Sequence, residues 1–244
     1  MGCPAKKVCN RLAGSALLQD EDLVARILDA VVAAVDVPVT LKTRLGYLNG
    51  QENIMRVAKR AEEAGIAALA LHGRTREDMY LNTARYSLIK DVKEILNIPV
   101  IANGDIDSPE KAQYVLDYTG ADAIMIGRAA QGRPWIFREI AHYLKTGQHL
   151  HAPSIAEVKE VLLGHLTELY EFYGEYSGCR ISRKHIAWYT KGLRSSNEFR
   201  QSMYQVENTA DQYRVVEDYF NTLLEHGLTM NDVQVEAVNL LQTQ

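Results

Sequence analysis

Four short apolar runs alternate with helical patterns in the first 150 residues of the chain. The runs span residues 37–42, 66–72, 98–103 and 121–127. Each is bounded by turn or charged residues, a pattern typical of strands buried on both faces of a parallel sheet. The starts of the runs are 29, 32 and 23 residues apart, which is the spacing of repeated βα units. The pattern therefore predicts four consecutive βα units.

The helical stretches between and after these runs carry recognisable end signals. The stretch 52–65 ends on a glycine, as helices often do. The stretch 108–120 begins with Ser108 as the expected N-cap and stops at Gly120. From 152–174 onward the pattern is helical, and we find no convincing strand up to the C-terminus.

A chemically useful residue follows or ends every predicted strand. These residues are Lys42, His72, Asn103 with Asp105, and Gly127 with Arg128. A (β/α)₈ barrel places its working residues at many strand ends, whereas a doubly wound sheet concentrates them at one switch point. We therefore favour the barrel. A complete barrel has eight strands in roughly 250 residues, so we expect residues 1–147 to be the C-terminal part of a TIM barrel whose N-terminal strands are missing. We expect residues 148–244 to form an all-helical domain.

Composition adds little to this interpretation, but the charge distribution adds one feature. A hydrophobic content of 47%, a charged content of 24% and a net charge of −4 are ordinary for a globular protein. Within residues 176–200, however, six basic residues stand against one acidic residue. Arg180, Lys184 and Trp188 share one helical face there by their i, i+4 spacing. A charge run is usually a solvated face, but the interleaved aromatic residues suit contacts to a phosphate backbone.

Cysteine use and hydropathy bear on the cellular compartment. Cys3, Cys9 and Cys179 form neither a disulfide framework nor a metal-binding spacing, which favours a reducing compartment. No apolar run approaches the length of a membrane span, and the N-terminal residues lack the apolar centre of a signal peptide. We expect a cytoplasmic protein without a metal site and without a membrane partner.

Cys3 lies between Gly2 and Pro4, where the mouth of a barrel would be. An unperturbed thiol has a pKa of about 8.5, so at neutral pH it is mostly protonated and can donate a proton. Lys6 and Lys7 would instead favour a nucleophilic thiolate, and an inert buried cysteine is a third possibility. The residues alone leave these alternatives open.

Glycines at the last two predicted strand ends indicate an anion site. Gly104 and Gly127 would let backbone N–H groups approach a phosphate, with a helix N-terminus following each glycine. Arg128 would add a cation, and barrels frequently bind phosphate after their last two strands. Two ordinary glycine turns are the alternative.

Lys42 and Arg44 are two residues apart and would face the same side of a strand. Two cations at a barrel mouth suggest an anionic or electron-rich ligand. His72 is equally well explained as a ligand contact or as a structural histidine.

Taken together, these residues resemble the bacterial tRNA-dihydrouridine synthases, most closely the B-type. The matching stretches are MGCPAKKV, AGSALL, VPVTLKTRLG, HGRT, PVIANGDI, YTGADAIMIGRAAQGRPWIFREI and RKHIAWY. The similarity covers essentially the whole chain. It implies an FMN-containing TIM barrel followed by a helical tRNA-binding domain. Such an enzyme reduces specific uridines of the tRNA D-loop to 5,6-dihydrouridine and uses NADPH as the reductant.

The resemblance also implies a role for each candidate residue. Cys3 would be the catalytic general acid that protonates C5 of the uracil, while hydride from the reduced flavin reaches C6. Arg44 would lie close to the target base. The FMN would be bound by Lys42, His72, Asn103, Gly104, Asp105, Gly127 and Arg128. The tRNA backbone would be contacted by Arg180, Arg183, Lys184 and His185.

The chain departs from the family pattern at its N-terminus. A PMAG-type strand end and a Gln on a later strand are absent, and an Asn three residues before the cysteine would precede residue 1. We therefore expect the chain alone to bind FMN weakly or not at all, and to associate through unpaired strand edges. One alternative is a truncated, catalytically inactive tRNA-binding fragment. Another is a different FMN-dependent barrel oxidoreductase acting on a small metabolite, which would leave the basic stretch unexplained.

Overall fold

The computed structural model describes residues 1–2 and 13–227, which fold as two compact units. The chain passes from the first unit to the second after Gly147, and the short stretch Gln131–Trp135 also belongs to the second unit. Each unit has its own apolar core.

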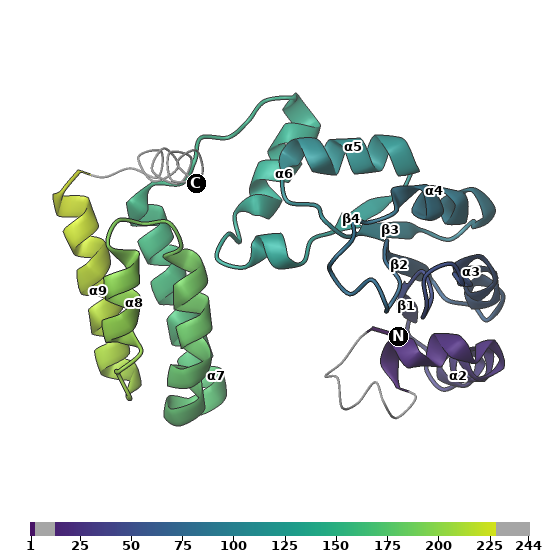
Figure 1. Ribbon diagram of the computed structural model, residues 1–244, viewed down its shortest axis with the longest axis horizontal. Helices are drawn as coiled ribbons and strands as arrows, with labels where there is room; N and C mark the ends of the chain where they lie inside the picture. The colour runs from purple at the N-terminus through teal and green to yellow at the C-terminus, as the bar shows by residue number, and fades with distance from the viewer. Residues whose placement is uncertain (3–12, 228–244) are drawn as a thin grey trace. The chain divides into compact units, whose positions relative to one another are not determined.

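The first unit is built around a four-stranded parallel sheet with the spatial order β1-β2-β3-β4 (Figure 1). Its strands are β1 (Thr40–Arg44), β2 (Ala68–His72), β3 (Val100–Asn103) and β4 (Ala123–Met125). Its helices are η1 (Gly14–Gln19), α2 (Glu21–Ala33), α3 (Ile54–Glu63), α4 (Tyr86–Ile95), α5 (Pro109–Thr119), η2 (Arg128–Ala130) and α6 (Ile136–Thr146). Sequential parallel strands confirm the four βα units and their barrel-type order, because a doubly wound sheet would reverse its strand order at a switch point.

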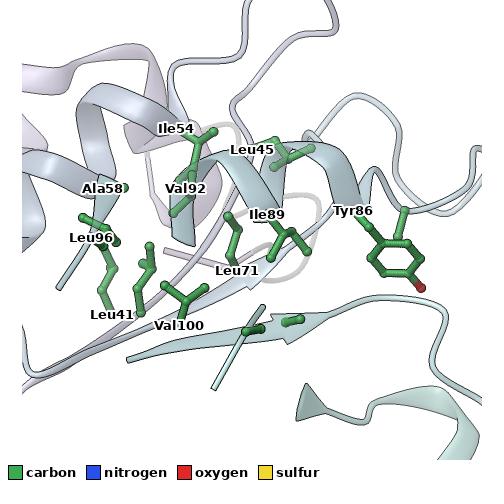
Figure 2. Packing of buried hydrophobic residues seen from close by; sticks show 14 of the residues in the cluster. Leu41, Leu45, Ile54, Ala58, Leu71, Tyr86, Ile89, Val92, Leu96 and Val100 are labelled. Atoms are coloured by element: carbon green, nitrogen blue, oxygen red, sulfur yellow. The ribbon is translucent and has the colours of Figure 1, made fainter. Parts of the chain in front are cut away.

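Alternate residues give the sheet one buried face and one more open face. Leu41, Leu71 and Val100 lie on the buried face, where they pack with residues of α3 and α4 such as Ile54 and Ile89 (Figure 2). The expectation that the strands are buried on both faces holds best for β2. It is wrong for β1 and β4, which lie at the edges of the described sheet and carry exposed residues. Helices α3 and α4 pack on the buried face of the sheet, whereas Lys42 of β1, on the other face, is exposed.

The ends of the elements follow local chemistry. The strands begin two or three residues later than the apolar runs, which start with loop residues around Pro38 and Pro99. The Ser108 side chain accepts a hydrogen bond from the backbone N–H of Lys111, which confirms it as the N-cap of α5. Gly120 ends this helix with φ of 66°, in the left-handed region that favours glycine.

The second unit is helical and contains α7 (Ile155–Tyr189), α8 (Ser196–Met203) and α9 (Thr209–Glu225) (Figure 1). Helix α7 is interrupted at Gly174, where φ is 71° and ψ is 173°. The backbone of Gly178 lies so close to Tyr170 that an added Cβ would be 3.1 Å from its Cα atom. The two arms of α7, residues 155–173 and 175–189, therefore form an antiparallel hairpin. The stretch predicted to be helical from residue 152 is the first arm.

Within the parts of the chain that the structure describes, no helix combines the length and apolar character needed to cross a membrane. In the same residues, no three His, Cys, Asp or Glu side chains gather as ligands for a metal ion.

Candidate functional site

A cavity of about 720 Å³ lies at the carboxyl ends of the strands. Among the described candidate residues of the first unit, all line this cavity: Lys42, Arg44, His72, Asn103, Gly104, Asp105, Gly127 and Arg128. Cys3 lies outside the described residues. The structure thus brings together side chains that are up to 86 positions apart in the sequence, from Lys42 to Arg128.

Strand register explains how these side chains meet. Arg44, His72 and Asn103 are register partners on three neighbouring strands, so they form one row across the sheet. Lys42 is paired with Ala70, whose side chain is small. The Lys42 side chain therefore extends across β2, and its Nζ atom donates a hydrogen bond to Asn103 Oδ1 over 3.1 Å. Asn103 Nδ2 in turn donates to the backbone oxygen of Met125 on β4 over 2.7 Å.

His72 is only 8% exposed and contributes a neutral imidazole to the cavity. Burial lowers its pKa to about 4, and the nearby cations Arg44 and Lys42 contribute to this shift. The ring can therefore offer one hydrogen-bond donor and one acceptor at neutral pH. It also packs on the turn after β3, because a Cβ at Gly104 would be 2.9 Å from His72 Cδ2. The ligand-lining and structural interpretations of His72 are therefore compatible.

Asp105 forms the centre of an ion-pair group at the rim of the cavity. Its carboxylate accepts two hydrogen bonds from Arg74, of 2.8 and 2.6 Å, and one from the backbone N–H of Ala84. Arg128 Nη2 lies 3.3 Å from the same carboxylate. Burial alone would raise the pKa of Asp105, but the hydrogen bonds from Arg74 and Ala84 hold it below its ordinary value. The carboxylate of Asp105 is therefore negatively charged and positions the two arginines.

Arg74 is a residue of this site that the sequence did not single out. It is 3% exposed, and besides Asp105 its guanidinium contacts the backbone oxygen of Asn82. Arg74 follows His72 by two residues in the stretch HGRT, so the sequence did place an arginine near this strand end. A buried, paired arginine and a solvated one look alike in sequence, however, so the stretch did not indicate that Arg74 belongs to the site.

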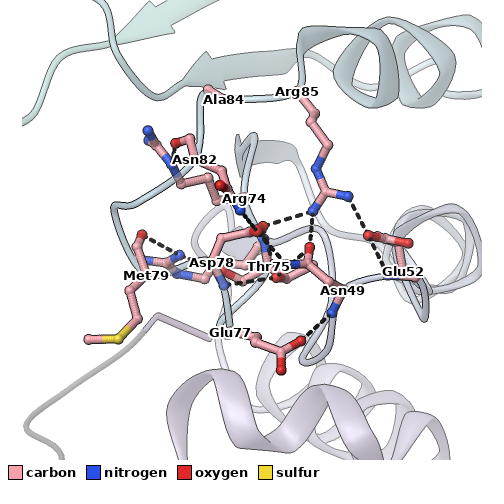
Figure 3. A network of polar contacts seen from close by, with 12 residues as sticks. Asn49, Glu52, Arg74, Thr75, Glu77, Asp78, Met79, Asn82, Ala84 and Arg85 are labelled. Carbon is pink, nitrogen blue, oxygen red and sulfur yellow. Dashed lines mark hydrogen bonds and ion pairs between the residues drawn. The ribbon is translucent and has the colours of Figure 1, made fainter.

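A second polar network ties the loops after β1 and β2 together (Figure 3). Asp78 accepts hydrogen bonds from Thr75, Asn49 and Asn82, and it forms an ion pair with Arg85 over 2.8 Å. Burial opposes ionisation, but these hydrogen bonds keep the pKa of Asp78 well below its usual range. The loops above the strand ends are thus held by charged and polar contacts.

Arg44 takes part in the same arrangement and is 6% exposed. Its Nη1 atom donates to the backbone oxygen of Thr75 over 2.7 Å and lies 3.4 Å from that of Met79. The guanidinium of Arg44 therefore supports the loop between β2 and α4 as well as lining the cavity.

The helices that follow the two glycines differ in their distance from them. The short 3-10 helix η2 (Arg128–Ala130) begins directly after Gly127, and the longer helix α6 begins only at Ile136. After Gly104, helix α5 begins at Pro109. The prediction of a helix N-terminus after each glycine therefore holds at Gly127 only for the short η2. It is wrong at Gly104, because residues 105–108 separate this glycine from α5.

The candidate residues of the second unit lie on the second arm of α7 and differ in exposure. Arg180 and Lys184 are exposed, with the Arg180 guanidinium 4.2 Å from the ring centroid of Tyr176. Arg183 is half-buried, and its Nη2 atom donates to the backbone oxygen of Val206 over 2.8 Å. His185 packs its ring against His165, with the ring centroids 4.7 Å apart. Two of the four residues thus face solvent, and two make contacts within the unit.

Comparison with known proteins places this chain in a family. The family model described as dihydrouridine synthase matches residues 1–224. The tRNA-dihydrouridine synthase B of Shewanella oneidensis is 58% identical over 226 residues, which cover 93% of this chain and 70% of the relative. The protein of the same name from Pseudomonas aeruginosa is 60% identical over 220 residues, which cover 90% of this chain and 66% of the relative. The chain thus spans about two thirds of the length of these relatives, and it belongs to the dihydrouridine synthase family.

Proposed function

We propose that this chain serves the reduction of specific uridines in the D-loop of tRNA to 5,6-dihydrouridine, with FMN as cofactor and NADPH as the source of reducing equivalents. The observation that carries the proposal is the convergence of Lys42, Asn103 and Arg128 on one cavity at the strand ends, in a chain of this family. The names of the relatives supply the substrate class.

The residues at the cavity fit an FMN. Its volume of about 720 Å³ lies within the usual range for ligand sites. A Cβ at Gly127 would meet no atom within 4 Å, so the backbone there borders open space that a phosphate can approach. Arg128, whose side chain is 57% exposed, can turn a bidentate guanidinium to the same phosphate. We assign the binding of FMN to Lys42, His72, Asn103, Gly104, Gly127 and Arg128.

Asp105 has a different role in this proposal. A carboxylate would repel a phosphate, and its oxygens already accept hydrogen bonds from Arg74 and Ala84. Asp105 therefore supports FMN binding by holding Arg74 and by lying close to Arg128.

The chemistry requires a hydride at C6 and a proton at C5 of the uracil. FMN, when bound in reduced form, supplies the hydride. We assign the proton to the thiol of Cys3, and the charge left on the base during the reaction is offset by the cations Lys42 and Arg44. Both cations line the same cavity, where they would lie near the base.

The second unit is proposed to bind tRNA through its basic arm. Arg180 and Lys184 are exposed beside Tyr176 and Trp188, which suits contacts to the phosphate backbone. Arg183 and His185 are proposed to support this arm from its inner side. Bringing a base out of its stack costs a few kcal/mol, which such contacts would offset.

The proposal is tested by titrating the full chain with FMN, with the protein in excess and at concentrations high enough for the weak binding expected of this chain, and following the quenching of flavin fluorescence. We expect Arg128→Gln to weaken FMN binding about tenfold or more, because a charge-assisted bond to the phosphate is lost. Lys90→Gln, on the outer helix α4, is the matched control and should leave the affinity unchanged. Equal affinity of the Arg128→Gln variant and the wild type would contradict the assigned site.

Activity is measured as dihydrouridine formed in an unmodified tRNA transcript with FMN and NADPH, detected by mass spectrometry. Cys3→Ala should abolish product and keep tRNA binding. A chain that binds tRNA but does not bind FMN would instead be an inactive tRNA-binding fragment. A chain that binds FMN but does not bind tRNA would favour an oxidoreductase of small metabolites.

A further inference from the structure

The buried side chain of Tyr86 is hydrogen-bonded to a backbone turn that lines the cavity. Tyr86 is the first residue of α4 and is 8% exposed, and its ring packs at one end of the core of the first unit (Figure 2). Its hydroxyl group donates a hydrogen bond to the backbone oxygen of Gly104 over 2.7 Å. Burial and the nearby Asp105 carboxylate raise the pKa of this hydroxyl group above its ordinary value, so it keeps its proton and remains a donor.

The turn that accepts this bond has a rare backbone conformation. The φ angles of Gly104 and Asp105 are 124° and 51°. A positive φ is costly for a residue with a Cβ, and it persists only where the surrounding contacts hold it. One set of contacts is made by the Asp105 carboxylate, which accepts hydrogen bonds from Arg74 and from the N–H of Ala84. The bond from Tyr86 to Gly104 is a further contact, and it acts directly on the backbone.

The bond from Tyr86 also determines where the next backbone N–H points. The carbonyl group of Gly104 and the N–H of Asp105 belong to one peptide group. No peptide bond of the described residues is cis, so this carbonyl and this N–H point in opposite directions. Gly104 and Asp105 line the cavity, whereas Tyr86 is not among its lining residues. The N–H of Asp105 is therefore directed away from Tyr86 and toward the cavity.

This N–H is available to a ligand. Among the residues that the structure describes, no backbone oxygen accepts a hydrogen bond from it. The carboxylate of the same residue is engaged by Arg74 and Ala84, so Asp105 offers a ligand its backbone donor. A backbone N–H in a turn of this kind is suited to an anion.

We propose that Tyr86 is a positioning residue, whose hydroxyl group fixes the turn at Gly104 so that the N–H of Asp105 donates to the phosphate of the bound cofactor. The inference rests on the proposed function and adds to it a residue that lies outside the cavity. Tyr86→Phe removes the hydroxyl group and keeps the ring, which packs edge to face on Tyr114 and lies 4.9 Å from the Lys111 ammonium. The variant should therefore lose the positioning of the turn and retain the fold.

The first test compares FMN with riboflavin, which has the same ring system and ribityl chain but no phosphate. Each flavin is titrated with the full chain in excess, and flavin fluorescence gives both affinities. We expect Tyr86→Phe to weaken FMN binding about 3- to 10-fold, the effect of one neutral hydrogen bond, and to leave riboflavin binding unchanged. Tyr114→Phe, which removes a hydroxyl group from the neighbouring ring, is the matched control and should change neither affinity. An equal loss for both flavins, or no loss for FMN, would overturn the inference.

The second test uses inorganic phosphate and does not depend on a flavin. The ¹⁵N NMR signal of the Asp105 amide is followed as phosphate is added to the full chain, with sodium chloride at the same ionic strength as the control. We expect the signal to shift in the wild type and in Tyr114→Phe, and Tyr86→Phe to need about 3- to 10-fold more phosphate for the same shift.

The two tests separate this inference from the cofactor assignment. A phosphate-dependent shift that is weakened by Tyr86→Phe, in a chain that binds no FMN, would reject the cofactor assignment and keep the role of Tyr86. An Asp105 signal that does not respond to phosphate in the wild type, or that responds equally in Tyr86→Phe, would overturn the role of Tyr86.

Discussion

At the scale of single residues, the cavity depends on ionisable side chains whose surroundings change their charge. His72 is kept neutral by burial and by Arg44 and Lys42, and Asp105 is kept negative by Arg74. The neutral state of His72 does not follow from the residue type, because an unperturbed histidine is partly protonated near neutral pH. Asp105 keeps the charge that is ordinary for an aspartate, although burial alone would raise its pKa. The contacts around each group therefore decide what it can offer to a ligand.

The neutral His72 predicts a pH dependence of stability. Its pKa falls from 6.5 in the unfolded chain to about 4 in the folded chain, so the unfolded state binds more protons between these values. The free energy of unfolding should therefore decrease by about 1–3 kcal/mol as the pH falls from 6.5 to 4. Urea unfolding at several pH values measures this, with His72→Gln as the variant in which the dependence is smaller. Part of it remains, because burial also lowers the pKa values of His165 and His185.

The part of this range above about pH 5 separates the effect of His72 from that of the paired carboxylates, which include Glu21 and Glu52 with an ordinary pKa of 4.5. Asp78 and Asp105 have pKa values lowered by their partners, so their contributions are present above about pH 4 and are lost as the pH falls further. An NMR titration that places the pKa of His72 near 6.5 would contradict the prediction.

At the scale of elements, the hairpin of α7 shows how one glycine redirects a long helical sequence. The first arm begins with a capping box in which Ser154 and Glu157 exchange side-chain and backbone hydrogen bonds. The reversal occurs at Gly174, and the arms then approach closely at Gly178. The exposed basic residues Arg180 and Lys184 follow directly on the second arm.

Replacing Gly174 by alanine should destabilise the second unit by about 1–3 kcal/mol, because φ of 71° with ψ of 173° is a backbone region open essentially to glycine only. An added Cβ would meet no atom within 4 Å, so the cost is that of the backbone alone. Gly164→Ala is the matched control within the first arm. It also meets no atom and should stabilise the helix by about 0.5–1 kcal/mol.

Thermal unfolding followed by circular dichroism compares the two variants. A Gly174→Ala variant as stable as the wild type would show that the chain can reverse at this point without a glycine conformation.

At the scale of the whole molecule, two separate cores make two units that can respond independently. Leu71 belongs to the core of the first unit, and Phe220 belongs to that of the second. Both tryptophans of the chain, Trp135 and Trp188, lie in the second unit. Tryptophan fluorescence therefore reports on the second unit, and hydrogen exchange of the β2 amides reports on the first.

Truncating one core should move only the transition of its own unit. We expect Phe220→Ala to lower the stability seen by tryptophan fluorescence by about 3–5 kcal/mol, because a large cavity is left in the core, and to leave exchange of the β2 amides unchanged. Leu71→Ala should instead speed the exchange of the β2 amides and leave the stability seen by tryptophan fluorescence unchanged. Equal shifts of both signals in either variant would mean that the units unfold together.

The sequence by itself determined the local and repeating features of this protein. Apolar runs, a capping serine and glycine helix ends are short-range signals, so the four βα units and the limits of α5 could be predicted. Because parallel strands place their carboxyl ends at one edge, residues such as Lys42 and Asn103 could be expected near one site. The resemblance of several motifs to one family supplied the chemistry, which periodicity could not.

Only the tertiary structure decided which groups meet and which stay buried. The bond from Lys42 to Asn103 joins residues 61 positions apart, and that from Arg74 to Asp105 joins residues 31 positions apart. Such pairs depend on strand register and loop packing, which single-sequence patterns do not encode. The hydroxyl group of Tyr86 likewise meets the backbone of Gly104 only in the folded chain, since an exposed tyrosine and a buried one look the same in sequence.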